Sequence, residues 1–162
     1  FRPEEVQLVN GLGALPGTMG RKALTEKMRK GGYKFLSVVS SAAVVSDSAR
    51  IAEGVQIMAG AVIQANVDVG AHSVVNTSAS VDHDCAISEN VWISPGVTLC
   101  GRVTIEKDVF VGAGASVIQD LTLGRGASIA AGSIVIQSVK ANVDLRPTQE
   151  IIERQRTTRN HG

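Results

Sequence analysis

The sequence predicts an all-β fold, a parallel β-helix of hexapeptide repeats, and three observations lead to this prediction. Every sixth residue from Val45 to Val135 is aliphatic. Four positions after each of these lies a second small or apolar residue, so that two inward side chains flank an outward one, as in a short strand. The corner that follows ends in Gly, Asn or Asp in eleven of fifteen repeats from Ser48 to Gly132, and these residues tolerate the left-handed backbone of a tight corner.

A strand and corner of six residues cannot bury an apolar side alone, so the repeats must coil and stack. Three repeats make a triangular coil of 18 residues, and residues 45–134 supply five coils without an inserted loop. The composition agrees, because 17 glycines and only 3% aromatic residues suit narrow aliphatic packing. The periodicity leaves the hand of the coil open.

Residues 1–40 predict a partial α/β segment in front of the repeats. Val6–Val9 and Tyr33–Val39 have the character of strands, and Thr18–Lys30 that of a helix between them. Thr18 is placed to cap this helix, and the glycine pair after Lys30 is placed to end it. The segment therefore contains one β-α-β step of a parallel-sheet domain.

The repeats and the composition around them divide the chain into three regions. The partial α/β segment ends at residue 40, the β-helix occupies residues 41–140, and a polar, charged tail occupies residues 141–162. In the tail we expect at most a short helix around residues 149–156, because few apolar residues are available there for packing.

Charge and cysteine content bear on the partners and the compartment. The formal net charge is +1, so no bulk field attracts nucleic acid or an anionic membrane surface. Apolar runs stay well short of the roughly 20 residues of a membrane-spanning helix. The two cysteines lack a CxxC spacing and do not suggest a disulfide framework, which favours a cytoplasmic location.

One corner of the repeat, Asp82-His83-Asp84, places an imidazole between two carboxylates. Imidazole is the commonest general base in enzymes, and a neighbouring carboxylate can orient it and strengthen it as a base. A solvated polar corner without a catalytic role explains the same three residues equally well. The residues alone leave both interpretations open.

The stretch NTSASVDHDCAISENVWISPGVTLCG, residues 76–101, resembles the sialic acid O-acetyltransferase and bacillosamine N-acetyltransferase family of bacterial sugar acyltransferases. The similarity includes GVQIMAGAVIQ, residues 54–64, and extends over roughly residues 4–138. It implies a left-handed β-helix, a homotrimer and acetyl-CoA as co-substrate. The implied acceptor is a sugar or nucleotide sugar, O- or N-acetylated in bacterial surface-glycan biosynthesis.

The same resemblance implies roles for individual residues. The histidine of the family's His-acidic-Cys motif is the catalytic base, which is His83 here, and Asp84 after it raises its basicity. Transfer is direct, without a covalent acyl-enzyme. The family's contacts to acetyl-CoA fall at Trp92, Ala113 and Ala131. Family members often have His at the Trp92 position, so that an aromatic stacking contact or an interface role replaces a polar contact there.

Gly101 lies one 18-residue coil after His83, in the same column of corners. Without a side chain, its backbone would be open to a thioester, which makes Gly101 a candidate acetyl-CoA contact. A plain turn glycine is an equally good interpretation.

Other polar residues favour structural roles. A metal site would have to gather Asp82, His83 and Cys100, a weak ligand set for zinc, so we expect no metal. His72 lacks flanking carboxylates and is expected to be a surface turn residue. Cys85 occupies an inward position and is expected to act as a small buried hydrophobe rather than a nucleophile.

The outward strand residues differ among the three faces of the predicted prism. One face carries an apolar stripe of Val74, Trp92 and Phe110, which a monomer would expose and a partner subunit would cover. Closed packing of three subunits would bury two faces of each prism. His83 lies at the corner opposite the Trp92 face, so a site that uses both must be shared between subunits. The remaining face is plainly polar and consists of Arg50, Asp68, Ala86, Thr104 and Thr122.

Two other functions remain open at this point. A non-catalytic trimeric β-helix scaffold would need the same repeats, with the corner carboxylates only solvating the coil. An acetyltransferase for another small acceptor, such as an amino acid or a free sugar, would need the same base. The repeats themselves contain no residue pattern that identifies the acceptor.

Overall fold

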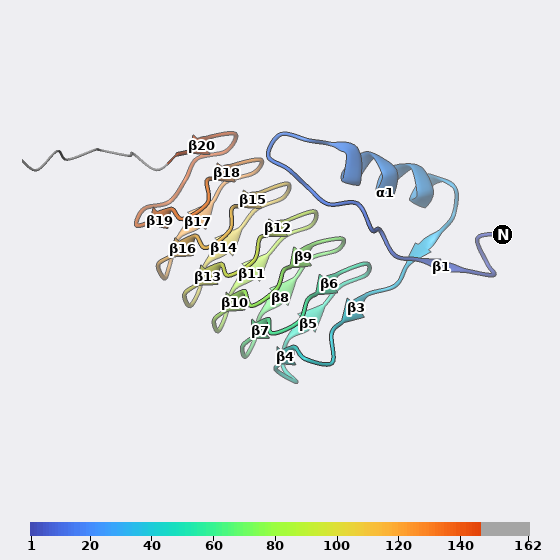
Figure 1. Cartoon of the computed structure of the whole chain (residues 1–162), viewed down its shortest axis with the longest axis horizontal. Helices are drawn as coiled ribbons and strands as arrows, with labels where there is room; N and C mark the ends of the chain where they lie inside the picture. The colour runs from blue at the N-terminus through green and yellow to red at the C-terminus, as the bar shows by residue number, and fades with distance from the viewer. Residues whose placement is uncertain (147–162) are drawn as a thin grey trace, which may run out of the picture.

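A computed structural model of the chain describes residues 1–146 (Figure 1). Residues 147–162, including the expected short helix around residues 149–156, lie outside the described residues. The chain folds as a left-handed parallel β-helix preceded by a short β-α-β segment, as the sequence and its resemblance predict.

The solenoid consists of two-residue strands that form three parallel sheets, one on each side of a triangular prism. The seven-stranded sheet contains β3 (Val38–Val39), β6 (Gln56–Ile57), β9 (Val74–Val75), β12 (Trp92–Ile93), β15 (Phe110–Val111), β18 (Ser128–Ile129) and β20 (Asp144–Leu145). The six-stranded sheet contains β4 (Val44–Val45), β7 (Val62–Ile63), β10 (Ser80–Val81), β13 (Thr98–Leu99), β16 (Ser116–Val117) and β19 (Ile134–Val135). The five-stranded sheet contains β5 (Arg50–Ile51), β8 (Asp68–Val69), β11 (Ala86–Ile87), β14 (Thr104–Ile105) and β17 (Thr122–Leu123).

The strand register confirms the predicted coil. Trp92 pairs with Phe110 and Ile93 with Val111, so neighbouring strands are offset by one coil. The inward residues form one continuous aliphatic core along the prism. The second inward position of each repeat, which is Ala, Val, Ser, Cys or Leu, lies beside the corner, where little space remains. A six-residue repeat therefore determines both which side chains are buried and how large they are.

The backbone at the corners repeats as regularly as the core. Every sixth residue from Gly54 to Gly132 has a positive φ, between 55° and 70°. The series includes Ser78 and Arg102, which are not among the residue types that favour this conformation. Stacking of the coils therefore imposes the corner geometry even where the residue itself disfavours it.

The β-α-β segment differs in detail from the prediction. β1 (Gln7–Leu8) pairs with β2 (Lys34–Phe35), and α1 (Gly20–Lys30) lies between them in the chain. The strand expected over residues 33–39 is divided, because β3 leaves the segment and pairs with β6 of the solenoid.

The two ends of α1 test the expected capping. Thr18 does not cap the helix, which begins after Met19 without a side-chain cap. The Thr18 hydroxyl instead donates to the carbonyl of Leu15 at 2.8 Å and closes the preceding turn. Gly31 ends the helix as expected, and its N–H donates to the Lys27 carbonyl at 3.1 Å.

The solenoid extends past residue 140, into the region expected to be a polar tail. β20 pairs with β18 in the seven-stranded sheet, and Val139 forms an isolated bridge to Leu123. Two more partial repeats thus lie on the last coil.

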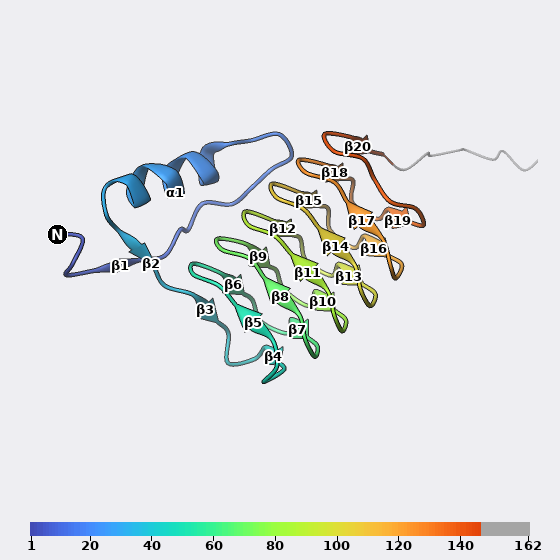
Figure 2. The same ribbon diagram turned by 180° about the vertical axis from the view of Figure 1, so that it is seen from behind.

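The β-α-β segment covers the outer side of the seven-stranded sheet, as Figures 1 and 2 show from opposite sides. Gln56 donates from Nε2 to the carbonyl of Asn10 at 2.8 Å, and Lys22 of α1 forms an ion pair with Asp108 at 2.8 Å. Val74 is fully buried. The expectation that a partner subunit covers the whole apolar stripe was therefore wrong, because the chain covers Val74 itself.

Candidate active site

The corner between the six-stranded and five-stranded sheets, here called the site corner, carries His83 and Asp84. The Nδ1 atom of His83 lies 2.8 Å from Oδ2 of Asp84. An ionised carboxylate can only accept, so a neutral ring in this contact carries its proton on Nδ1. Nε2 is then left as a proton acceptor at the opposite edge of the ring. Both side chains are about half exposed, within reach of a bound substrate.

The Asp84 carboxylate has a second polar partner one coil earlier. Its Oδ1 atom accepts a hydrogen bond from Nδ2 of Asn66 at 3.1 Å. The hydrogen bonds from His83 and Asn66 hold the pKa of Asp84 below its usual value, since both favour the charged form. Asp82, on the other side of His83, accepts the backbone N–H of His83 at 2.8 Å.

Gly101 lies directly against the imidazole of His83. A Cβ atom at Gly101 would come within 2.7 Å of both Cε1 and Nε2 of that ring. Gly101 is absent from the positive-φ positions of the corner, where Arg102 stands instead. Gly101 does lie in the turn of the site corner, as the turn-glycine interpretation held, and its lack of a side chain also makes room for the His83 ring.

The two cysteines lie beside this corner without taking part in its polar contacts with His83. Cys85 is buried, and burial raises the pKa of its thiol to about 11. Its Sγ atom donates to the carbonyl of Cys100 at 3.2 Å. Within residues 1–146, no group of three or more His, Cys, Asp or Glu side chains is placed to hold a metal ion.

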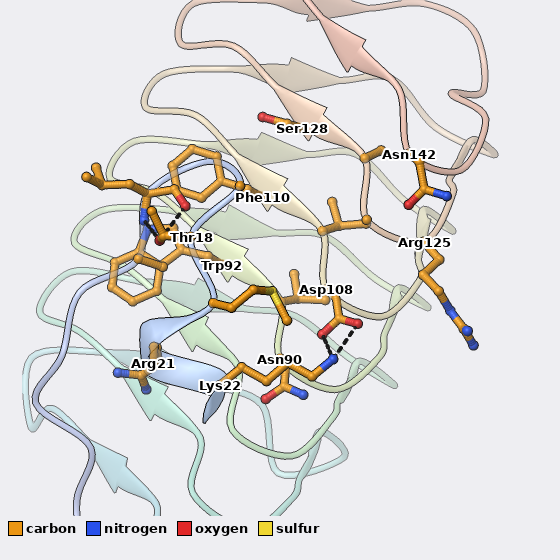
Figure 3. Close-up of a pocket in the computed structure, with 18 of the residues that line it drawn as sticks. Thr18, Arg21, Lys22, Asn90, Trp92, Asp108, Phe110, Arg125, Ser128 and Asn142 are labelled. Carbon is orange, nitrogen blue, oxygen red and sulfur yellow. Dashed lines mark hydrogen bonds and ion pairs between the residues drawn. The ribbon is translucent and has the colours of Figure 1, made fainter. Parts of the chain in front are cut away.

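Trp92 lies in a different place, in a cavity between the seven-stranded sheet and the β-α-β segment (Figure 3). The cavity has a volume of about 320 Å³. Trp92, Phe110 and Ser128 of three successive coils line it on the side of the sheet, and residues 14–15 and 17–19 with the first turn of α1 line it on the other side. The guanidinium of Arg21 lies 5.5 Å from the centre of the Trp92 ring, a cation–π contact.

The charges around this cavity come mainly from residues that sequence reasoning did not single out. Arg21 and Lys22 belong to α1, and Arg125 lies on the corner between the five-stranded and seven-stranded sheets. Burial lowers the pKa of Arg21 from its usual value, although the group keeps its charge in the physiological range. The basic residues of the first helical turn were visible in the sequence, but only the packing of α1 on the solenoid brings them to Trp92.

His72 lies on that same corner and is buried, so the expectation of a surface turn residue was wrong. Its ring packs edge-on against Phe35, with ring centres 5.1 Å apart. Burial, with a smaller contribution from Arg29, lowers the pKa of His72 below its usual 6.5. Phe35 belongs to β2, and the hexapeptide pattern by itself does not indicate which corner β2 covers.

Ala113 and Ala131 are exposed on the third corner, between the seven-stranded and six-stranded sheets. They stack in successive coils, and the N–H of Gly132 donates to the Ala113 carbonyl at 2.8 Å. The structure therefore brings Gly101 to His83, and Ala113 to Ala131, but it leaves Trp92 on the face opposite the site corner. Within one chain these residues do not form a single site.

Comparisons with known proteins agree with the fold. The family model "Bacterial transferase hexapeptide (six repeats)" matches residues 84–119. A search of curated proteins finds no match. Among solved structures, the acetyltransferase domain of PglB from Neisseria gonorrhoeae is 33% identical, with a TM-score of 0.81, over 88% of this chain and 68% of that domain.

Two similar structures contain bound molecules. The same PglB domain in complex with acetyl coenzyme A is 35% identical, with a TM-score of 0.75, over 80% of this chain and 63% of that one. A point mutant of the GDP-perosamine N-acetyltransferase from Caulobacter crescentus, in complex with CoA and GDP-perosamine, is 33% identical, with a TM-score of 0.76. That match covers 80% of this chain and 61% of the C. crescentus protein, so the chain spans less than two thirds of it.

The single helix among the described residues, α1, has 11 residues and is too short to cross a membrane.

Proposed function

The chain belongs to the family of hexapeptide-repeat sugar acetyltransferases, and from this premise we propose that it transfers an acetyl group from acetyl-CoA to the amino group of a nucleotide-linked amino sugar. The reaction would serve bacterial surface-glycan biosynthesis in the cytoplasm. Two relatives of the chain are complexes with CoA or acetyl-CoA, and one of these also contains a nucleotide sugar. The free thiols of Cys85 and Cys100 fit a reducing compartment.

The proposed catalytic step follows from the tautomer of His83, in which Nδ1 carries the proton and Nε2 is a free acceptor. Nε2 of the ring accepts a proton from the acceptor amine while the amine nitrogen attacks the thioester carbonyl. The bond between the carbonyl carbon and sulfur then breaks, and the CoA thiolate takes up the proton from His83. Asp84 holds the proton of the ring on Nδ1 and stabilises the imidazolium that forms during the reaction.

The observation that carries this proposal is the packing of His83 over Gly101. A Cβ atom at position 101 would collide with the Nε2 edge of the ring, so the missing side chain makes room for that edge, with the Gly101 backbone beside it as a contact for the thioester. The half-exposed His83 ring, paired with Asp84 and packed over Gly101, supports the catalytic role over the scaffold alternative.

We further propose that the active form is a homotrimer with its sites between subunits. The β-α-β segment covers the seven-stranded sheet, and ion pairs such as that of Arg50 with Asp68 occupy the five-stranded face. The six-stranded face instead exposes Val44 and Ile134, by 65% and 73%. Val44 and Ile134 lie on the two end strands of this face, and every outward strand residue between them is uncharged. A face without charges fits a subunit interface, and contact through it would bring the site corner of one subunit toward Ala113 and Ala131 of the next.

In such a trimer the acetyl-CoA contacts would be Gly101 of one subunit and Trp92, Ala113 and Ala131 of its neighbour. A mixing experiment tests the sharing. His83→Ala protein and Trp92→Arg protein, each inactive alone, should regain part of the activity after their subunits are exchanged. A stable monomer with full activity in sedimentation would exclude a shared site.

The activity itself is tested by thiol release from acetyl-CoA with a panel of acceptors. We expect release with nucleotide-linked amino sugars and an N-acetylated product in mass spectrometry. Release only with sialic acid would assign O-acetylation, and release only with amino acids or free sugars would assign another acceptor class. Absence of release with every acceptor, from protein that binds acetyl-CoA, would favour the scaffold.

A further inference from the structure

The last residue of each site corner forms a column of side chains, one per coil, that runs beside the proposed base His83. Its members are Asn66, Asp84, Arg102 and Asp120. All four have φ between 58° and 62°, so their Cβ atoms leave the backbone in the same direction. Polar side chains in this column are therefore neighbours across coils, as cross-strand pairs are in a sheet.

Asn66 occupies the coil before Asp84, and because of it the two oxygens of the Asp84 carboxylate have different partners. Its Nδ2 donates to Oδ1 of Asp84 at 3.1 Å, which leaves Oδ2 for His83 at 2.8 Å. Asn66 is held in turn, because its backbone N–H donates to Oγ of Ser48 at 3.0 Å. A carboxylate with one fixed oxygen has little freedom to rotate away from the imidazole.

Arg102 occupies the coil after Asp84 and is the strongest competitor for that carboxylate. Guanidinium groups bind carboxylates through two parallel hydrogen bonds and hold them more firmly than a neutral imidazole does. Arg102 instead makes this double contact with Asp120, at 2.6 and 2.8 Å. Arg102 nevertheless stands next to Asp84 in the column, one coil away, and its charge makes the smallest contribution to the lowered pKa of Asp84.

We propose that Asn66 and Asp120 are positioning residues of the His83 base: Asn66 orients the Asp84 carboxylate, and Asp120 holds Arg102 away from it. This inference rests on the proposed function. The charged groups around His83 are Asp82 and Asp84 on its own corner and Arg102 and Asp120 on the next two coils. Asp82 is engaged by the backbone N–H of His83, so Asp84 is the carboxylate that the column controls.

The decisive experiment removes Asp120 and then Arg102 as well. In Asp120→Ala, Arg102 turns to Asp84, His83 loses its partner, and kcat/KM falls about three- to tenfold with an unchanged KM for acetyl-CoA. In the double variant Asp120→Ala with Arg102→Ala, the competitor is gone and kcat/KM recovers. A double variant as impaired as the single one would overturn the proposal, since a merely structural ion pair is not restored by losing its second half.

The matched control is another ion pair between successive coils. Lys107 contacts Glu89 at 2.8 Å on the corner that α1 covers, far from His83. Glu89→Ala should leave kcat/KM unchanged. A loss equal to that of Asp120→Ala would mean that any broken ion pair between coils impairs the enzyme, and the proposal would fail.

Asn66 is tested by Asn66→Gly, which keeps the corner conformation and removes only the amide. We expect a threefold to fivefold loss in kcat and a shift of the acid limb of the pH–rate profile. Ser78→Gly, at the equivalent position of the third corner, should change neither. Unchanged kcat and an unchanged pH profile in Asn66→Gly would remove Asn66 from the proposal.

A spectroscopic readout separates this proposal from the proposed function. Nitrogen NMR of the histidine rings reports which His83 nitrogen carries the proton, with no need for turnover. We expect the Nδ1–H form in the wild type, a mixture in Asp120→Ala and in Asn66→Gly, and the Nδ1–H form again in the double variant. This result from a protein without acetyl transfer would refute the proposed function alone, whereas an unchanged ring in all variants would refute the positioning.

Discussion

Two histidines of the same solenoid each pack against a glycine one coil away, yet their surroundings differ. The ring of His72 fills the space over Gly54, and the ring of His83 fills the space over Gly101. His72 is buried beneath Phe35 of the β-α-β segment, whereas His83 is about half exposed and contacts Asp84. The segment that covers a corner, rather than the residues of the corner itself, therefore decides whether its histidine is structural or available for chemistry.

The largest expected difference between the two histidines is in catalysis. His83→Ala should lower the rate of acetyl transfer by about 10²- to 10⁴-fold, the usual loss for a general base. Because His83 is half exposed at a corner, the unfolding temperature and the binding of acetyl-CoA should stay near those of the wild type. Thiol release and calorimetry measure the two effects, and near wild-type turnover would end the assignment of His83 as the base.

The next effect is on stability, at the covered corner. Gly54→Ala should lower the free energy of unfolding by about 2–4 kcal/mol, because φ at Gly54 is +70° and the new Cβ would meet the buried His72 and Phe35. Denaturant unfolding measures this loss. A stability change below about 0.5 kcal/mol would show that the β-α-β segment shifts at little cost to make room for the new side chain.

The matched change at the site corner, Gly101→Ala, should lower activity rather than stability. Gly101→Ala requires no unusual backbone, and the half-exposed His83 ring can swing outward to make room. We expect stability close to the wild type and a loss of roughly tenfold or more in kcat/KM, since general-base catalysis needs a correctly placed ring. Equal stability losses in Gly54→Ala and Gly101→Ala would erase the distinction between the two corners.

The smallest expected effect is on how the stability of the protein depends on pH. The pKa of His72 is lowered from 6.5 by burial, so below pH 6.5 the unfolded chain binds a proton that the folded chain resists. Stability should therefore decrease as the pH falls from about 6.5. His72→Asn, which tolerates the positive φ of 61°, should flatten this dependence between pH 6.5 and 5.5. Thermal unfolding at several pH values measures it, and an equal slope in both proteins would contradict the buried state of His72.

The sequence predicted the solenoid and the site corner for a physical reason. In a stacked repeat the inward, outward and corner positions recur every six residues, so a residue's number alone assigns its place. His83, Asp84 and Gly101 could be grouped in this way, since one coil separates Gly101 from His83. The contact between Asn66 and Asp84 follows the same spacing and could have been found by it.

No such periodicity predicts where the residues of the β-α-β segment lie. The sequence by itself determined the coil, its core and the column of the proposed base, because each coil contacts only its neighbours. Only the tertiary structure decided that α1 and β2 cover the seven-stranded sheet, that His72 is buried and that Arg21 meets Trp92. These contacts join residues that no repeat relates, so they depend on how one apolar face packs against another.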